Sequence, residues 1–288
     1  MILREPCLPP GWYPRDKGAI KEFLEPIVKP AANSSQTSGR KAVPAAVAPH
    51  AGWYYSGIPA AMAVSVLDPA AETVVVIGGH LPGGMPVLSA PEDGVKTPLG
   101  TIKIDRELRE LFEKQVKTRP DNYADNTVEV LLPMVHFLFP RSDLLWLRFP
   151  GELSSFDAGK LLAECAASLR RRIAVLASTD LTHYGRNYGF SPKGSGKPAL
   201  DWVKKVNDAA FINAVLEGNP ESVLERALED SSACSAGAVL GTMGFTASGG
   251  KVNARLLDYR TSADMGRDSG ESIPDSFVGY AAISLETG

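Results

Sequence analysis

Residues 73–80 read TVVVIGGH, and this stretch decides the fold. Its apolar run is continuous rather than alternating, and residues 173–178, IAVLAS, repeat that pattern. Such strands are typical of a parallel sheet whose two faces are both covered by helices. Helical and extended patterns alternate along the rest of the chain. The sequence therefore predicts the α/β fold class, as a single-domain three-layer α/β/α sandwich with a mainly parallel, mixed central sheet.

The expected elements follow from apolar periodicity and turn residues. Asp105 is expected to cap a helix that begins at Arg106, and Ser154 or Ser155 one that begins at Phe156. Pro133 is expected to kink or end a turn. We expect strands at residues 42–48, 72–77, 144–149, 173–177, 253–259 and 277–285, and helices at residues 18–27, 58–67, 106–115, 126–139, 156–171 and through much of 200–245.

One domain is expected over residues 1–288, with residues 31–41 as a mobile loop because they are small, polar and aperiodic. The formal net charge of −3 offers no basic field, so we expect neither nucleic acid nor a membrane surface as a partner. Three widely spaced cysteines argue against a disulfide framework and for a reducing compartment. No segment has the apolar length of a signal peptide or a membrane span. We therefore expect a cytoplasmic protein.

Three predicted strands are followed by residues that could bind a metal or transfer a proton. His50 follows the first strand, His80 follows the second, and Asp180 follows the strand at 173–177, with His183 three residues later. Because open α/β sheets bind ligands beyond the carboxyl ends of their strands, these side chains should converge, and neutral imidazole is the commonest metal ligand. A hydrogen-bonded turn residue is the alternative for each histidine. His136 lies in a helical apolar pattern and is expected to be a core or interface residue.

Cys234 follows two serines, Ser231 and Ser232, either of which could cap a helix. A thiol in the first turn of that helix would feel the positive end of the helix dipole, and its lowered pKa would favour a thiolate as nucleophile or metal ligand. The alternative is a buried small hydrophobic residue, which is the better interpretation of Cys165. Cys7 is expected to have no special role.

Asp180 and His183 lie at a spacing that lets the two side chains face each other in a short turn. A carboxylate beside imidazole raises the pKa of the ring and fixes its tautomer. The pair therefore suits acid/base catalysis or the support of a ligand. A capping role for Asp180 and a packed His183 are the alternative.

Several of these motifs together resemble a known family. The chain resembles the Memo family, also called AmmeMemoRadiSam system protein B, in the order and approximate spacing of its motifs along essentially its whole length. The resemblance implies a LigB-like fold, related to the LigB-type subunits of class III extradiol dioxygenases, with a metal in a cleft. It assigns the metal ligands to His50, His80 and Cys234, and it matches Asp180 and His183 to a nearby aspartate and histidine. The motifs are GWYP (11–14), PHAGWYYSG (49–57), GGH (78–80), TPLG (97–100), STDLTHYG (178–185), Cys234 and FVGYAA (277–282).

The chain departs from the family pattern at two places. Where the family usually has EHSxE, residues 125–129 read DNTVE, so Asp125 replaces a glutamate and Asn126 a histidine. Cys234 is followed by Ser235 where the family has glycine. Neither change removes an expected ligand, but both could alter the substrate pocket.

The leading functional hypothesis is a mononuclear metal protein with redox or dioxygenase-like chemistry, in which Fe(II) is expected and copper or zinc is the alternative. If the protein is an enzyme, His183 with Asp180 would do the acid/base work, while Tyr54, Tyr55 and Asn126 would contact the substrate. A second hypothesis is a non-catalytic scaffold that binds a peptide or protein in the same cleft. The family name implies radical-SAM and AMMECR-type proteins as partners. A third is a zinc-dependent hydrolase.

Overall fold

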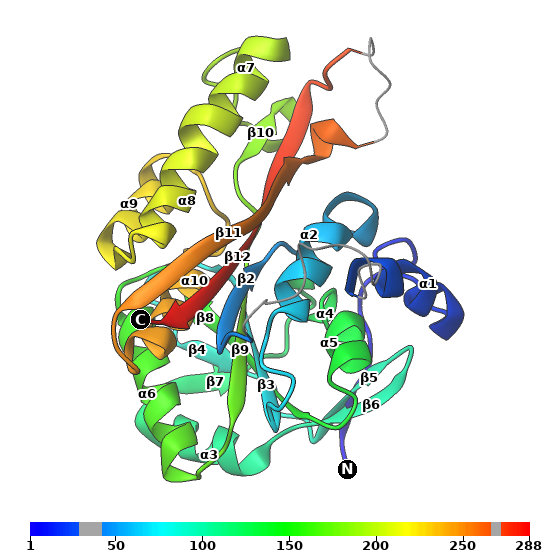
Figure 1. Ribbon diagram of the computed structural model, residues 1–288, viewed down its shortest axis with the longest axis vertical. Coiled ribbons are helices and arrows are strands. Elements are labelled where there is room, and N and C mark those ends of the chain that lie inside the picture. The colour runs from blue at the N-terminus through cyan, green and yellow to red at the C-terminus, as the bar shows by residue number, and fades with distance from the viewer. Residues whose placement is uncertain (29–41, 266–271) are drawn as a thin grey trace.

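The computed structural model describes residues 1–28, 42–265 and 272–288. The segment 31–41, predicted to be a mobile loop, lies outside the described residues. Four parallel strands form the centre of the main sheet, and their carboxyl ends meet at one edge (Figure 1). In spatial order they are β2 (Ala45–Ala48), β9 (Ile173–Ser178), β3 (Thr73–Leu81) and β8 (Asp143–Pro150).

The flanks of the main sheet are mostly antiparallel, which makes the sheet mixed as expected. Beside β2 lies the long strand β12 (Ser276–Thr287), which pairs antiparallel with β2, with β11 (Val252–Thr261) and with β10 (His183–Gly185). Beside β8 lies β4 (Val87–Ser89), antiparallel to it, followed by β7 (Thr118–Pro120). A separate small sheet contains β1 (Leu3–Arg4), β5 (Gly94–Thr97) and β6 (Gly100–Lys103).

Both faces of the central strands are buried, because helices cover each of them. Val74 and Val76 of β3 belong to the core beneath α1, α2, α4 and α5. Val75 and Ile77, which point the opposite way, belong to the core beneath α3, α6, α8, α9 and α10. This confirms the three-layer α/β fold class. The first group comprises α1 (Lys17–Val28), α2 (Trp53–Ser65), α4 (Asn126–Glu129) and α5 (Leu132–Leu138), and the second α3 (Arg106–Gln115), α6 (Ser154–Ser168), α8 (Asp208–Leu216), α9 (Pro220–Glu229) and α10 (Ala236–Ala247).

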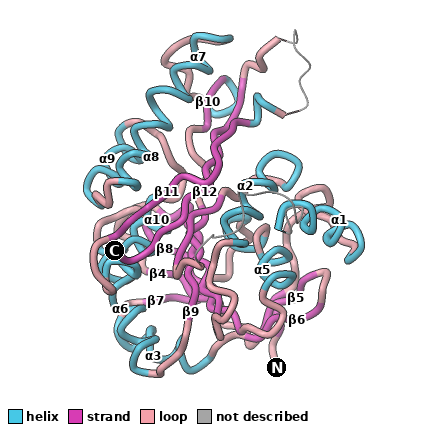
Figure 2. Tube along the Cα trace, in the orientation of Figure 1, coloured by secondary structure: helices cyan, strands magenta, loops and turns pink. Residues whose placement is uncertain are grey.

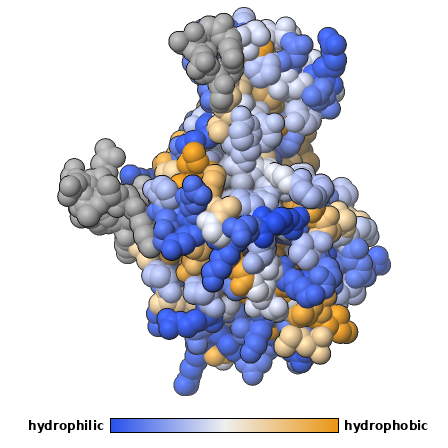
Figure 3. Space-filling model, turned by 90° about the vertical axis from the view of Figure 1, so that its right-hand side faces the viewer, coloured by the Kyte–Doolittle hydropathy of each residue, from blue (hydrophilic) through white to orange (hydrophobic). Residues whose placement is uncertain are grey.

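A smaller third core lies around Tyr184 and Phe277, where α7 (Gly196–Trp202) packs against β10 and β12. Figure 2 shows this part of the chain extending beyond the main sheet. Three short helical segments complete the described elements: η1 (Arg186–Tyr188), the π-helical η2 (Val203–Asn207) and η3 (Ser262–Asp264). Figure 3 shows hydrophilic and hydrophobic residues interspersed on one face of the molecule. In the described part of the chain, no helix combines the length and the apolarity needed to cross a membrane.

Local sequence patterns predicted some of the helix ends correctly and others incorrectly. Asp105 accepts a hydrogen bond from the Leu108 amide at 3.0 Å, which confirms the predicted cap of α3. The helix expected over 126–139 is instead two helices, and Pro133 lies in the first turn of the second, where its missing amide breaks no helical hydrogen bond.

The predicted serine caps are wrong. Ser155 lies inside α6 and donates its hydroxyl hydrogen to the Pro150 carbonyl at 2.6 Å, while Ser154 bonds Glu152. At the other helix, α10 begins at Ala236, so neither Ser231 nor Ser232 caps it. Cys234 therefore precedes this helix rather than lying in its first turn.

Candidate metal centre

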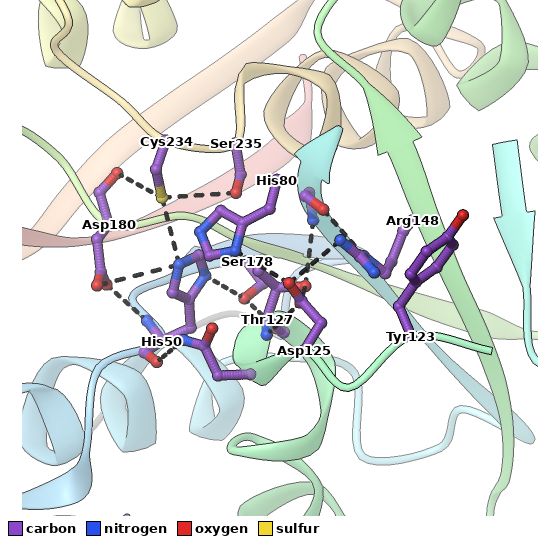
Figure 4. Close-up of polar contacts among 12 residues, drawn as sticks. His50, His80, Tyr123, Asp125, Thr127, Arg148, Ser178, Asp180, Cys234 and Ser235 are labelled. Atoms are coloured by element: carbon purple, nitrogen blue, oxygen red, sulfur yellow. Dashed lines mark hydrogen bonds and ion pairs between the residues drawn. The ribbon is translucent and has the colours of Figure 1, made fainter. Parts of the chain in front are cut away.

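Two imidazoles and one thiol meet at the carboxyl edge of the sheet (Figure 4). His50 follows β2, His80 lies near the end of β3, and Cys234 lies just before α10. The Cys234 Sγ is 3.2 Å from the His50 Nε2, and one ligand atom from each residue lies within 4.8 Å of the other two. The two rings stand nearly perpendicular, with centroids 4.9 Å apart. The structure thus brings together the three residues to which the resemblance assigned metal binding.

Close backbone packing sets these positions. A Cβ on Gly79 would lie 2.3 Å from Ser235, and one on Gly78 would lie 2.2 Å from the Thr127 hydroxyl oxygen, so both positions require glycine. The next residue, His80, has a φ of 58°, a conformation that costs a non-glycine residue about 1–3 kcal/mol. The GGH motif therefore brings the Cys234 segment against β3 and turns the His80 ring toward the thiol.

The hydrogen bonds of His50 fix its tautomer. The Ser178 hydroxyl donates its only hydrogen to the Thr127 carbonyl, so its oxygen accepts from the His50 Nδ1, which lies 2.9 Å away. With the proton on Nδ1, the Nε2 lone pair is directed at the Cys234 side. A fixed tautomer of this kind is the usual arrangement of a metal-ligating histidine.

His80 is held in the same way by a carboxylate. Its Nδ1 lies 3.0 Å from the Asp125 Oδ2, an oxygen that also accepts from the Arg148 guanidinium at 3.1 Å. The Nε2 of His80 is therefore the ring nitrogen available to bind a metal together with His50 and Cys234. Burial opposes protonation of the His80 ring, but the hydrogen bonds with Asp125 and Cys234 outweigh it and raise its pKa to about 10.

The Cys234 thiol lies in surroundings that favour its thiolate. Burial raises the pKa of this thiol, but the adjacent His50 and His80 rings have the larger combined effect and lower the pKa well below its usual value. A thiolate is the form that binds a metal ion. The positive end of a helix dipole is therefore not the main cause, contrary to the sequence-based expectation.

The three residues fit a single metal ion. A tetrahedral zinc site, with bonds of about 2.3 Å to sulfur and about 2.0–2.1 Å to nitrogen, holds its donor atoms roughly 3.5 Å apart. The 3.2 Å between Cys234 Sγ and His50 Nε2 and the 4.8 Å limit for the whole set need only small side-chain adjustments to meet that spacing. Two imidazoles, which bind a metal in their neutral form and release any Nε2 proton when they do so, and one thiolate also suit Fe(II) or copper.

A cavity of about 740 Å³ opens beside the centre and reaches both histidines. Of the predicted substrate-contacting residues, Tyr55 and Asn126 line this cavity, whereas Tyr54 is 64% exposed and does not. Asn126 also donates its side-chain amide to the His50 carbonyl at 2.9 Å. Aromatic rings make up much of the remaining lining: those of Trp12, His183, Tyr188 and Tyr280.

Asp180 and His183 both line the cavity, but they do not pair as expected. The buried Asp180 carboxylate accepts from the His50 backbone amide at 2.7 Å and lies 4.0 Å from the His50 Nε2. His183 instead donates from Nδ1 to the Leu181 carbonyl at 3.1 Å, and its ring packs edge-on against Tyr188. Asp180 therefore supports His50, and the Nε2 of His183 is left for the cavity.

Asp125 has a charge partner that was not predicted from the sequence. Arg148 lies in the buried strand β8, bonds the Gly79 carbonyl through Nε at 2.9 Å, and holds both Asp125 and Asp121. Figure 4 shows Asp125 between His80 and Arg148. A signal was present, because an arginine inside the apolar run LLWLRF (144–149) needs a buried partner.

Replacing Asp125 with asparagine is expected to weaken metal binding by roughly 10–100-fold, the usual cost of losing the carboxylate behind a ligating histidine. Asparagine can still cap α4, where Asp125 accepts from the Thr127 amide, so the fold should persist. Chelator competition measures the affinity, and Asp157→Asn at an exposed carboxylate is the control. Equal affinities in the two variants would contradict a role for Asp125 in holding His80.

The segment that carries Asp180 and His183 is anchored by a buried carboxyl group. Asp208 of α8 accepts from the Thr182 amide at 3.0 Å, from the Thr182 hydroxyl, and from the Tyr259 hydroxyl at 2.7 Å. Burial raises the pKa of Asp208 to about 7, although these hydrogen bonds oppose the shift.

This raised pKa predicts a pH-dependent stability. Between about pH 4 and 7 the carboxyl group stays protonated in the folded protein but ionises in the unfolded chain, so the free energy of unfolding should fall by up to about 1.4 kcal/mol per pH unit. Asp208→Asn should remove this contribution. Urea unfolding of both proteins from pH 4.5 to 7.5 measures it, and parallel pH profiles would refute the expectation.

Comparison with known proteins extends the sequence resemblance. A protein-family model described as Memo-like protein matches residues 4–284. A MEMO1 family protein of Pyrococcus furiosus is 29% identical over 298 residues, which cover 99% of this chain and 99% of that protein. One from Pyrococcus abyssi is 30% identical, with the same coverage of 99% for each. A solved structure of an uncharacterized Escherichia coli K12 protein aligns with 83% of this chain and 99% of that chain, at 13% identity and a TM-score of 0.46.

Proposed function

The chain belongs to the Memo-like protein family, and we propose that it is a mononuclear metal protein with dioxygenase-like redox chemistry in the cleft beside His50, His80 and Cys234. The observation that carries this proposal is the geometry of the three donors. Two Nε2 atoms, oriented by hydrogen bonds at the opposite ring nitrogens, and one thiolate face a common point next to a cavity of about 740 Å³. Three protein ligands leave positions open for further ligands, as in non-haem iron sites.

The side chains around the centre have separate tasks in this proposal. His50, His80 and Cys234 would hold the metal, for which Fe(II) is the first candidate and copper or zinc the alternative. When bound, the metal would supply a place where a substrate oxygen and a second ligand meet. His183 would hold or move a proton at Nε2, because its Nδ1 is already committed to a backbone carbonyl. Asp180 would keep His50 in place.

The character of the cavity favours an uncharged organic substrate. Its described lining contains aromatic rings and amides, with Asp180 as an acidic group and no lysine or arginine. A phosphorylated peptide needs a cationic cluster, usually of arginine. A small hydroxylated ring compound, which can stack on Tyr55 or Tyr188 and place oxygen near the centre, suits this lining better. The scaffold hypothesis therefore has less support for a phosphorylated peptide than for an uncharged one.

Metal analysis of protein purified without oxygen, followed by oxygen uptake with a panel of catechols and related diols, tests the proposal. We expect one metal ion per chain and diol-dependent oxygen consumption, with both lost in His50→Ala. A matched control is His136→Ala, because His136 bonds Thr97 and lies outside this cavity. Zinc without oxygen uptake would favour the hydrolase alternative. Trace metal, with His50→Ala indistinguishable from the unaltered protein, would refute a metal protein altogether.

A further inference from the structure

A second cavity reaches the same metal ligands from another direction. It measures about 230 Å³ and is lined by Cys234, which does not line the larger cavity, and by His80, which lines both. The His80–Cys234 part of the centre therefore lies between the two cavities. The lining of the small cavity comes from the end of β3 and the turn after it, the turn after β8, the end of α9, the segment before α10 and the start of α10. Besides the two ligands it includes Leu81, Gly151 and Leu228.

The chemical character of the two cavities differs. Apart from the two ligands, the side chains of the small cavity are hydrocarbon or absent, and none carries a charge. The larger cavity instead contains Asp180, Asn126, Asn187 and several tyrosine and histidine rings. Hydrocarbon side chains favour small nonpolar molecules such as xenon over water, while main-chain atoms and the two ligands supply the polar part of this lining, which opens to solvent beside the exposed Leu228. The small cavity therefore suits a small nonpolar guest, and the larger one suits an organic molecule with hydroxyl groups.

We propose that the small cavity is a binding site and entrance for dioxygen, which reaches the centre from the side of His80 and Cys234. This inference rests on the proposed function, because it supplies the second of two reactants that must meet at one metal. An organic substrate bound in the larger cavity would block that route to the metal for dioxygen. A separate apolar entrance removes that conflict, since a diatomic gas needs little space and no polar contacts.

Two glycines allow the cavities to be closed one at a time. A Cβ on Gly151, in the small cavity, would meet only the Leu81 carbonyl oxygen, at 3.6 Å. A Cβ on Gly52, in the large cavity, would likewise make only ordinary contacts, the nearest to the Trp12 carbonyl oxygen at 3.6 Å. Neither residue has a positive φ. Leucine at either position should therefore occupy its cavity without disturbing the backbone.

Xenon under pressure is the probe for the small cavity. Crystals of the protein should show a xenon atom beside Cys234 and Leu81, this atom should be lost in Gly151→Leu, and it should persist in Gly52→Leu. Absence of xenon from the unaltered protein, or equal occupancy in Gly151→Leu, would overturn the proposal. The measurement needs neither metal nor activity, so it is independent of the proposed function.

Oxygen kinetics give the second readout. In the metal-loaded protein, Gly151→Leu should raise the KM for oxygen severalfold and leave the KM for the diol unchanged, while Gly52→Leu should do the reverse. Identical changes in both variants would show that the two reactants share one entrance. If xenon binds but no diol supports oxygen uptake, the proposed function fails and the small cavity remains a gas-binding site of unknown use.

Discussion

Cys234→Ser is expected to weaken metal binding by more than the roughly 10–100-fold that loss of an outer hydrogen-bond partner costs. The thiol is poised as a thiolate, because His50 and His80 lower its pKa well below the usual value. A serine hydroxyl stays protonated at neutral pH and is a poor ligand for Fe(II), copper or zinc. The imidazoles alone would then hold the ion. Chelator competition with each metal measures the loss.

Cys165→Ser is the matched control for this change. Cys165 is 3% exposed in α6 and belongs to the core between that helix and the sheet, away from the candidate centre. Its replacement should lower stability slightly and leave metal affinity unchanged. Equal metal affinities in the two variants would contradict the assignment of Cys234 as a ligand, whatever their effects on folding.

Gly244→Ala should destabilise the fold by about 3 kcal/mol or more, at the upper end of the usual range for overpacking. In α10, a Cβ at this position would lie 1.8 Å from the Phe156 carbonyl oxygen of α6. The contact is reciprocal, because a Cβ on Gly159 of α6 would lie 1.9 Å from the Gly241 carbonyl oxygen. Backbone atoms meet in both cases, so only separation of the two helices could relieve the clash. The midpoint of urea unfolding measures the effect.

Gly18→Ala makes the same chemical change in the exposed first turn of α1. Its Cβ would meet only the Asp16 Oδ1, at 2.9 Å, an exposed oxygen that accepts from the Ala19 amide at 3.0 Å and can shift without backbone movement. Alanine there should be neutral or should stabilise the protein by up to about 1 kcal/mol through helix propensity. Similar effects of the two substitutions would mean that α6 and α10 do not approach as closely as the structure shows.

The pattern of apolar residues along the sequence was sufficient to predict the fold class. The continuous apolar runs at 73–77 and 173–177 are buried parallel strands, with side chains that alternate between the two helix-covered cores. Helix boundaries were harder to predict. α2 begins at Trp53 rather than Ile58, because its start is held by tertiary contacts such as the hydrogen bond from the Trp53 amide to the Trp12 carbonyl.

For the candidate site, the sequence determined which residues could act, because histidines and aspartates after successive strands must gather at one sheet edge. Only the tertiary structure decided how they are arranged. It made Asp180 a partner of His50 instead of His183, placed Arg148 behind Asp125, and separated two cavities at His80 and Cys234. These contacts join residues far apart in the chain, and their geometry depends on how whole helices and strands pack. Periodicity along the chain carries no information about that packing, whereas the continuous apolar runs do show that both faces of the central strands are buried.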